Sequence, residues 1–191
     1  APQISPAARA DLAPTGKLRV GINYGNVILA TRDPASGELR GVHVELAREL
    51  GRRVGVPVEL IGYAAAGPMV EGLKSGALDA ALLSAEPARA TEINFSPAYV
   101  EVDATYLVPA GSPIRNVADA DRDGSRIAVA AKSAYEFFLN RSLQHAKLVN
   151  APSTNAAFDL FAEKKLDALV GIRPRLVAEA PHHDEGLPAL P

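Results

Sequence analysis

Short apolar runs and longer stretches with helical spacing alternate along this chain. Runs that predict strands in the first half occur at residues 18–22, 58–61 and 80–83. Residues 46–54 carry apolar side chains at helical spacing, and Gly55 ends this predicted helix. A second helix is predicted to begin at Gly67-Pro68 and to close at Gly76, because proline favours a first turn and glycine a helix end.

Three further stretches of the first half complete this pattern. The polar stretch 23–41 predicts an irregular loop. The run 80–83 is continuously apolar, which is typical of a strand buried on both faces. Residues 102–108 predict an extended segment, and Pro-Ala-Gly-Ser-Pro at 109–113 then punctuates the chain as a linker.

The same order of elements follows this linker. Strands are predicted at 127–130, 148–149 and 168–170. Ser133 opens a helix whose Glu136 completes a Ser-x-x-Glu capping box, and Thr154 is able to cap the next helix. Arg173-Pro174 leads into a final helix. Alternating strands and helices predict an α/β fold with mostly parallel sheets flanked by helices. We expect a first lobe at 1–108, a hinge or crossover at 109–113 and a second lobe with an irregular tail at 114–191.

Composition limits the partners of the chain. The 191 residues carry a net charge of −2, so nothing indicates a nucleic acid or an anionic membrane. Cysteine is absent, which excludes disulfides and thiolate metal sites. No apolar run approaches the roughly 20 residues that span a bilayer. The opening Ala-Pro-Gln-Ile-Ser-Pro is typical of a mature amino terminus left after signal-peptide cleavage.

Arg89 is the most informative candidate for a binding role. It lies in the loop beyond the carboxyl end of strand 80–83, where open α/β sheets bind their ligands. An arginine there is suited to hold a carboxylate or a phosphate. The alternative is an ion pair that braces the loop. Ser84, at the end of the same strand, is able to offer a hydroxyl or a backbone group.

Catalytic and metal-binding patterns are weak. His182-His183-Asp184-Glu185 has metal-binding residue types, but it is bounded by proline and glycine and predicts a solvated tail. The sequence contains no Gly-x-Ser-x-Gly motif and no phosphate-cradling loop. We therefore expect neither an enzyme nor a bound cofactor.

Seven segments together resemble family 3 of the periplasmic solute-binding proteins of ABC importers, the polar amino acid branch. They are Leu18-Arg-Val-Gly-Ile, Gly41-Val-His-Val-Glu-Leu-Ala, Leu73-Lys-Ser-Gly-Ala-Leu-Asp-Ala, Phe95-Ser-Pro-Ala-Tyr, Val108-Pro-Ala-Gly-Ser-Pro-Ile, Ile127-Ala-Val-Ala-Ala-Lys-Ser-Ala and Lys165-Leu-Asp-Ala-Leu-Val. The similarity covers roughly residues 16 to 178. It implies a two-lobe type II periplasmic binding protein-like fold that closes on a small carboxylate-bearing ligand. It also implies a periplasmic location and docking of the closed form on a membrane permease.

The resemblance also assigns candidate ligand contacts. Arg89 occupies the position that holds the ligand carboxylate in the family, within a loop about two residues shorter. Ser133 and the adjoining Lys132 lie where the family uses a helix amino terminus for the same carboxylate. Tyr24 is placed as a pocket wall and Asn23 as a polar contact, and Gly25 allows a close backbone approach.

One position departs from the amino acid binders that the chain resembles. Those proteins carry an aspartate for the ligand ammonium after the last strand, and Ile172 stands there in this chain. A buried ammonium needs a carboxylate partner. We therefore expect an organic acid, with Arg173 as a second contact. Glu86, which replaces the usual hydroxyl near Arg89, is also able to hold an ammonium, so an amino acid ligand stays open.

A second departure concerns length, because family members continue beyond the Asp-Ala-Val-Val strand to complete the first lobe. The carboxyl-terminal part of this lobe is apparently missing, so the chain is either cut short or a shortened relative. Exposed apolar surface would then favour a homodimer. Two alternative functions stay open, a sensor or accessory binding domain and a cyclohexadienyl dehydratase-like enzyme that uses Glu86.

Overall fold

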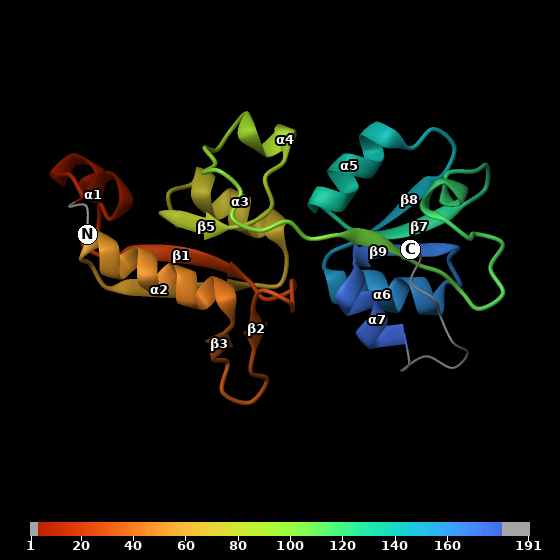
Figure 1. The fold of residues 1–191 in the computed structure, drawn as a ribbon, viewed down its shortest axis with the longest axis horizontal. Coiled ribbons are helices and arrows are strands. Elements are labelled where there is room, and N and C mark those ends of the chain that lie inside the picture. The colour runs from red at the N-terminus through yellow and green to blue at the C-terminus, as the bar shows by residue number, and fades with distance from the viewer. Residues whose placement is uncertain (1–3, 181–191) are drawn as a thin grey trace. The chain divides into compact units, whose positions relative to one another are not determined.

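The computed structural model describes residues 4–180 and divides the chain into two compact units, Ala1–Asn94 and Phe95–Pro191. Each unit contains its own sheet and its own helices (Figure 1). The expected crossover was 109–113, whereas the division falls after Asn94. The reason is that β6 (Ala104–Leu107) pairs with the last strand of the second unit.

The sheet of the first unit has three parallel strands in the order β4-β1-β5. They are β1 (Leu18–Asn23), β4 (Val58–Tyr63) and β5 (Ala80–Leu82). Its helices are α1 (Pro6–Leu12), α2 (Val42–Val54), α3 (Ala66–Lys74) and the short α4 (Pro87–Ala90). The α/β pattern and the elements β1, β4, α2 and α3 agree with the sequence prediction, whereas the helices α1 and α4 were not predicted. β5 differs, because it lies at an edge of this sheet and is half-buried rather than enclosed on both faces.

Helices α2 and α3 cover opposite faces of this sheet. Val20 of β1 packs in one cluster with Val44 of α2. Gly21 faces the other way, and a Cβ there would meet Met69 of α3 at 3.4 Å. Helix α2 approaches the sheet closely at Gly51, where a Cβ would lie 2.0 Å from Cγ2 of Val58. The small residue therefore sets the distance between α2 and β4.

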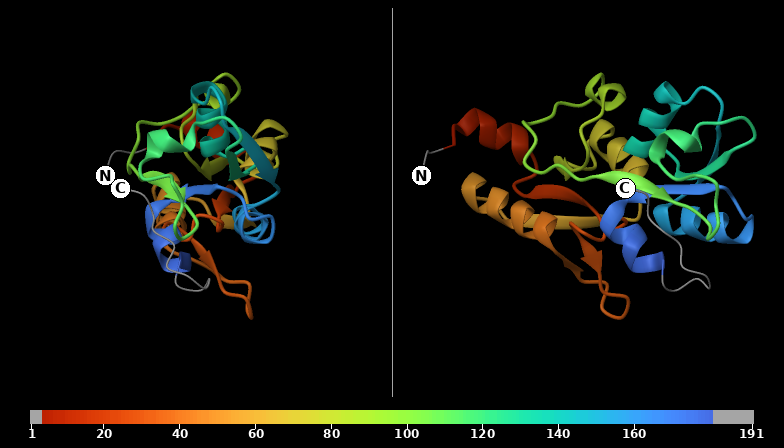
Figure 2. Two further views of the ribbon diagram at one scale, coloured as in Figure 1. Left: turned by 90° about the vertical axis from the view of Figure 1, so that its right-hand side faces the viewer. Right: turned by 45° about the vertical axis from the view of Figure 1, so that its right-hand side comes forward.

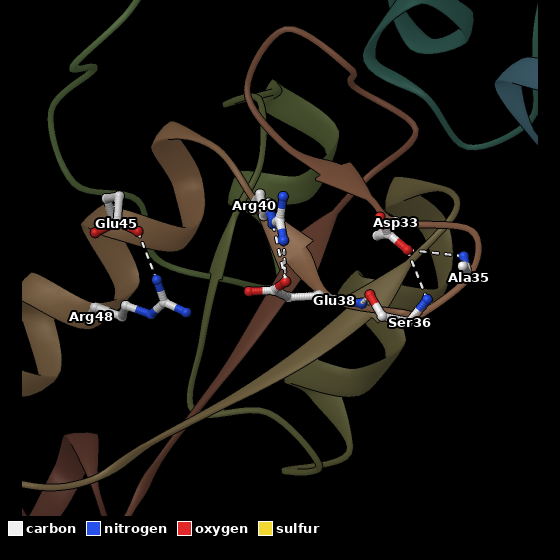
Figure 3. A network of polar contacts seen from close by, with 7 residues as sticks. All are labelled: Asp33, Ala35, Ser36, Glu38, Arg40, Glu45 and Arg48. Carbon is white, nitrogen blue, oxygen red and sulfur yellow. Dashed lines mark hydrogen bonds and ion pairs between the residues drawn. The ribbon is translucent and has the colours of Figure 1, made fainter.

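A hairpin interrupts the loop that was predicted to be irregular. Strands β2 (Thr31–Arg32) and β3 (Leu39–Arg40) pair antiparallel. Figure 3 shows the turn between them, in which Oδ1 of Asp33 accepts hydrogen bonds from the N–H groups of Ala35 at 2.9 Å and Ser36 at 2.7 Å. Strands of two residues are too short to produce a recognisable alternation, so the sequence pattern misses them.

The second unit is built on a four-stranded sheet with the order β6-β9-β7-β8. Strands β7 (Arg126–Ala130), β8 (Lys147–Ala151) and β9 (Ala168–Ile172) are parallel, and β6 runs antiparallel to β9. The helices are α5 (Ala134–Ser142), α6 (Thr154–Glu163), α7 (Arg173–Glu179) and the 3-10 turn η1 (Val117–Ala120).

Two apolar clusters lie on the two faces of this sheet. Val129 of β7 packs on the face that carries Leu139 of α5. Ala128 packs on the opposite face with Phe158 of α6 and Leu176 of α7. Figure 2 shows α6 and α7 on one side of the sheet and α5 on the other.

The helices α5 and α6 begin close to the predicted positions, but the capping residue of α6 differs from the prediction. The N-cap of α6 is Ser153 rather than Thr154, and its Oγ accepts a hydrogen bond from the N–H of Ala156 at 3.1 Å. The solvated tail predicted at 182–185 lies outside the described residues. No helix within 4–180 has the length and apolarity that crossing a membrane requires.

Candidate functional site

The candidate residues of the first unit gather at the carboxyl edge of its parallel sheet. β1 ends at Asn23, β4 at Tyr63 and β5 at Leu82. Because parallel strands end together, the segments that follow them share one edge, where ligands of open α/β sheets bind. All five first-unit candidates lie at or after these strand ends: Asn23, Tyr24, Ser84, Glu86 and Arg89.

Arg89 is buried in the short helix α4. The residue is only 3% exposed. Its Nη1 donates a hydrogen bond to the carbonyl oxygen of Ser84 at 2.8 Å. Burial lowers the pKa of Arg89, and the charge of Glu86 opposes that shift. Arg89 thus braces the loop through a hydrogen bond to the backbone, where the alternative expected from the sequence was an ion pair. The clamp itself stays a prediction.

Glu86 is the N-cap residue of the same helix and is 6% exposed. Its carbonyl oxygen accepts hydrogen bonds from the N–H groups of Arg89 and Ala90, both at 2.9 Å. A buried acid thus caps the start of a four-residue helix, Pro87–Ala90, that contains a buried base. The acid compensates the arginine charge, which a buried guanidinium requires.

The Asn23-Tyr24-Gly25 turn is held by its own contacts. Oδ1 of Asn23 accepts a hydrogen bond from the N–H of Gly25 at 2.9 Å, and the N–H of Tyr24 donates to the carbonyl of Tyr63 at 2.9 Å. The guanidinium of Arg32 lies 5.5 Å from the centre of the Tyr24 ring, a cation–π arrangement. Tyr24 is thus in contact with the β2–β3 hairpin through Arg32 of β2.

Gly25 allows a close backbone approach, and in the structure this approach is to another segment of the protein, while the expected approach to a ligand stays a prediction. A Cβ at this position would lie 2.3 Å from the carbonyl oxygen of Ala64. Only glycine fits this approach of the turn after β1 to the segment after β4. The residue therefore fixes the shape of the edge, whatever binds there.

The candidates of the second unit also follow strand ends. Ser133 is the N-cap of α5, and its Oγ accepts a hydrogen bond from the N–H of Glu136 at 3.2 Å. The predicted capping box is only half formed, because the Glu136 carboxylate accepts from the N–H of Lys132 instead of from Ser133. Lys132 has a positive φ of 56°, which turns that N–H toward Glu136. The backbone N–H of Lys132, which was expected to be available to a ligand, thus donates to Glu136 within the protein.

Arg173 starts α7, and its N–H donates to the carbonyl oxygen of Asp103 at 3.1 Å. The neighbouring arginine, Arg175, is the buried one and is 6% exposed. Its Nε donates to Oε1 of Glu179 at 2.8 Å, and its Nη2 donates to Oδ1 of Asn155 at 2.7 Å. Sequence reasoning missed both Arg175 and Asn155. The one available signal was the four-residue spacing of Arg175 and Glu179, which favours a pair along a helix.

Tyr135 lies in the first turn of α5, the helix that follows β7. Burial raises the pKa of its hydroxyl to about 12, while the positive charge of Arg175 acts in the opposite direction. Ile172, the last residue of β9, is 5% exposed and brings an apolar side chain to this edge. Within residues 4–180, no cluster of three histidine or acidic side chains is arranged to hold a metal ion.

The sequence profile of the bacterial extracellular solute-binding proteins, family 3, matches residues 18–179. The chain belongs to this family. The match covers nearly all of both units and confirms the resemblance inferred from the seven segments. No curated protein sequence matches the chain.

Three solved structures of similar fold are described as amino acid-binding proteins. One is an ancestral amino acid-binding protein described as a precursor of cyclohexadienyl dehydratase, with a TM-score of 0.78 and 22% identity over 96% of this chain and 80% of the other. A substrate-binding protein of an amino acid ABC transporter from Streptococcus pneumoniae, bound to L-arginine, gives 0.78 and 20% over 94% and 76%. Holo arginine-binding protein from T. maritima gives 0.77 and 22% over 94% and 78%. At these identities the similarity establishes the type II periplasmic binding fold.

Proposed function

We propose that this family 3 member captures a small carboxylate-bearing solute in the periplasm and delivers it, chemically unchanged, to the permease of an ABC importer. The observation that carries the proposal is the buried Arg89 at the carboxyl edge of the first sheet, in a chain matched by the family over residues 18–179. A guanidinium in such surroundings attracts a carboxylate more strongly than an exposed one does, because little water screens it.

An organic acid is the ligand class that we favour. Ile172 brings no charge to the edge of the second sheet, and Glu86 already faces the charge of Arg89. Neither residue then serves an ammonium group, which needs a carboxylate partner when it leaves water. The similar solved proteins are described as binding amino acids, so L-arginine and L-glutamine are the competing ligands to test.

A thermal-shift screen followed by calorimetry tests the proposal. Succinate, lactate, L-arginine and L-glutamine are compared on the wild-type protein, on Arg89→Gln and on Arg48→Gln. Arg48 is an exposed arginine of α2 paired with Glu45, so its variant controls for the loss of one positive charge. We expect an organic acid to raise the melting temperature of wild type and Arg48→Gln, but not of Arg89→Gln.

Two results contradict parts of this proposal. If only the amino acids stabilise the wild type, the interpretation of Ile172 is wrong. If a broad panel of small carboxylates leaves the melting temperature unchanged, the solute-binding function itself is wrong for this chain. Light scattering on the same samples, with and without ligand, tests the homodimer expectation.

A further inference from the structure

We propose that the carboxamide of Asn26 is a specificity-determining contact, which selects carboxylates that also bear a hydroxyl group over carboxylates that lack one. The inference rests on the proposed function and deepens it, because it names the substrate class as a hydroxycarboxylate. The observation that carries it is an enclosed oxygen atom. Oδ1 of Asn26 is buried and accepts no hydrogen bond from any residue within 4–180.

The main chain of Asn26 is used by the turn that follows β1. Its N–H donates to the carbonyl of Asn23 at 3.4 Å, and its carbonyl accepts from the N–H groups of Leu29 and Ala30, both at 3.0 Å. An asparagine in a turn often hydrogen-bonds the backbone through its side chain as well. Asn23 does so in this turn, since its Oδ1 accepts from the N–H of Gly25 at 2.9 Å. The Asn26 oxygen takes no such part, which leaves it for a donor from outside the protein.

Asn26 lies at the candidate edge of the first unit. β1 is the middle strand of the sheet, and Asn26 comes three residues after its last residue, Asn23. The contact of Gly25 with the carbonyl of Ala64 holds this turn against the segment that follows β4. On the other side of β1, the segment after β5 carries Arg89. The carboxamide and the guanidinium therefore belong to segments that follow adjacent parallel strands.

A buried acceptor distinguishes ligands by the donor that they bring. Without a donor the acceptor is costly, because it has lost its hydrogen bonds to water. A ligand hydroxyl removes this cost, whereas a methylene group in the same place retains it, so the analogue without the hydroxyl is rejected. An ammonium group is also a donor, but a neutral carboxamide does not compensate its charge out of water. The Asn26 oxygen therefore favours a hydroxyl over both alternatives.

The experiment compares ligand pairs that differ by one hydroxyl group, lactate with propionate and malate with succinate, by calorimetric titration. L-alanine, which carries an ammonium in place of the lactate hydroxyl, is the third probe. The proteins are wild type, Asn26→Leu and the control Asn94→Leu, in which an exposed asparagine of the same unit is changed. We expect wild type and Asn94→Leu to prefer the hydroxylated member of a pair by about tenfold. Asn26→Leu has a side chain of similar size without the acceptor, so it should lose this preference.

The melting temperature of the ligand-free variants supplies a second readout. Leucine removes an acceptor that has no donor, so Asn26→Leu should melt no lower than wild type. A lower melting temperature with an unchanged preference would mean that the carboxamide holds the loop, and the inference would be overturned. Tighter binding of L-alanine than of lactate would also overturn it.

Wild type alone keeps the inference testable if Asn26→Leu does not fold. Equal affinities within both ligand pairs would refute the selection of a hydroxyl group, while the proposed solute-binding function would stand. If wild type binds no carboxylate at all, the proposed function and this inference fail together.

Discussion

Asp79 accepts three hydrogen bonds from Arg19, one from the main-chain N–H at 2.8 Å and two from the guanidinium, at 2.9 Å from Nε and 2.6 Å from Nη2. The N–H of Asp79 returns a bond to the carbonyl of Arg19 at 2.9 Å. The chain is thereby joined between the residue before β5 and the second residue of β1. Asp167 and Arg126 repeat the main-chain part of this arrangement at the start of β9 and β7, with bonds of 2.8 and 3.0 Å.

Asp79→Asn should lower the melting temperature of the first unit by about 5 °C, because a buried charge-assisted pair is lost. Asp167→Asn should cost less, since its side chain is 38% exposed and Arg126 Nε lies 3.5 Å away, whereas Asp79 is 3% exposed. Calorimetry of both variants checks this order. Equal losses would contradict the role given to the guanidinium.

The same pair predicts a pH dependence at low pH. The bonds from the Arg19 side chain hold the pKa of Asp79 below its usual value. The folded state therefore binds this proton less readily than the unfolded state does, and the stability that the pair provides is present above the usual pKa near 4. It should be lost as the pH falls through the folded pKa. Urea unfolding between pH 5 and pH 3 should show a shallower loss for Asp79→Asn than for wild type.

His43 predicts a second pH dependence, nearer neutrality. Its side chain is 3% exposed at the start of α2, and burial lowers its pKa. The unfolded chain thus takes up the proton first, so stability is complete above the usual histidine pKa near 6.5 and declines as the pH falls below it. Unfolding between pH 7.5 and pH 5 should show this decline in wild type and not in His43→Gln. The exposed His145 offers a control, since His145→Gln should retain the decline.

Gly51→Ala should destabilise the first unit by about 1–3 kcal/mol, because the added methyl group overlaps Val58 at the contact between α2 and β4. The backbone at Gly51 is helical, so conformational strain is not the cause. The double variant Gly51→Ala/Val58→Ala removes the overlapping Cγ2 and should recover part of the loss. If the loss of unfolding free energy in the double variant equals the sum of the losses in the two single variants, the clash does not involve Val58.

Ser133→Ala and Ser153→Ala should each cost the second unit about 1 kcal/mol, because each removes an N-cap bond to a helix N–H. Because Oγ of Ser133 acts as the acceptor in this bond, its hydroxyl hydrogen is still able to donate to a carboxylate. Ser133→Ala should therefore also weaken binding of the organic acid found in the screen, whereas Ser153→Ala should not. Chemical unfolding and calorimetric titration of the two variants separate capping from ligand contact.

Elements with a strong local pattern were predictable from the sequence, and long-range relationships were not. The helix 46–54 ends at Gly55 as expected, since Gly55 adopts the left-handed conformation with φ of 75°. The β2–β3 hairpin and the membership of β6 in the second sheet depend on pairing between distant residues, which no local periodicity encodes. Strand β5 has the composition of an enclosed strand, yet its burial depends on neighbours that its own residues do not specify.

The candidate site divides in the same way. Position along the chain was enough to bring Asn23, Ser84 and Ser133 to strand ends, because every segment that follows a parallel strand reaches the same edge. Which arginine is buried was not predictable. Arg173 and Arg175 flank Pro174 with the same side chain, and only the rotation of α7 against α6 decides that Arg175 meets Asn155.

The links between Asp79 and Arg19, and between Asp167 and Arg126, lie where strands begin, whereas the candidate ligand groups lie where strands end. A five-residue strand separates the two edges by about 16 Å, beyond the range at which substitutions usually influence one another. Substitutions at the strand ends are therefore expected to leave the links at the strand starts intact. The candidate edge is in this sense separable from the scaffold, because the contacts that hold the strands in register lie at the other end of each sheet.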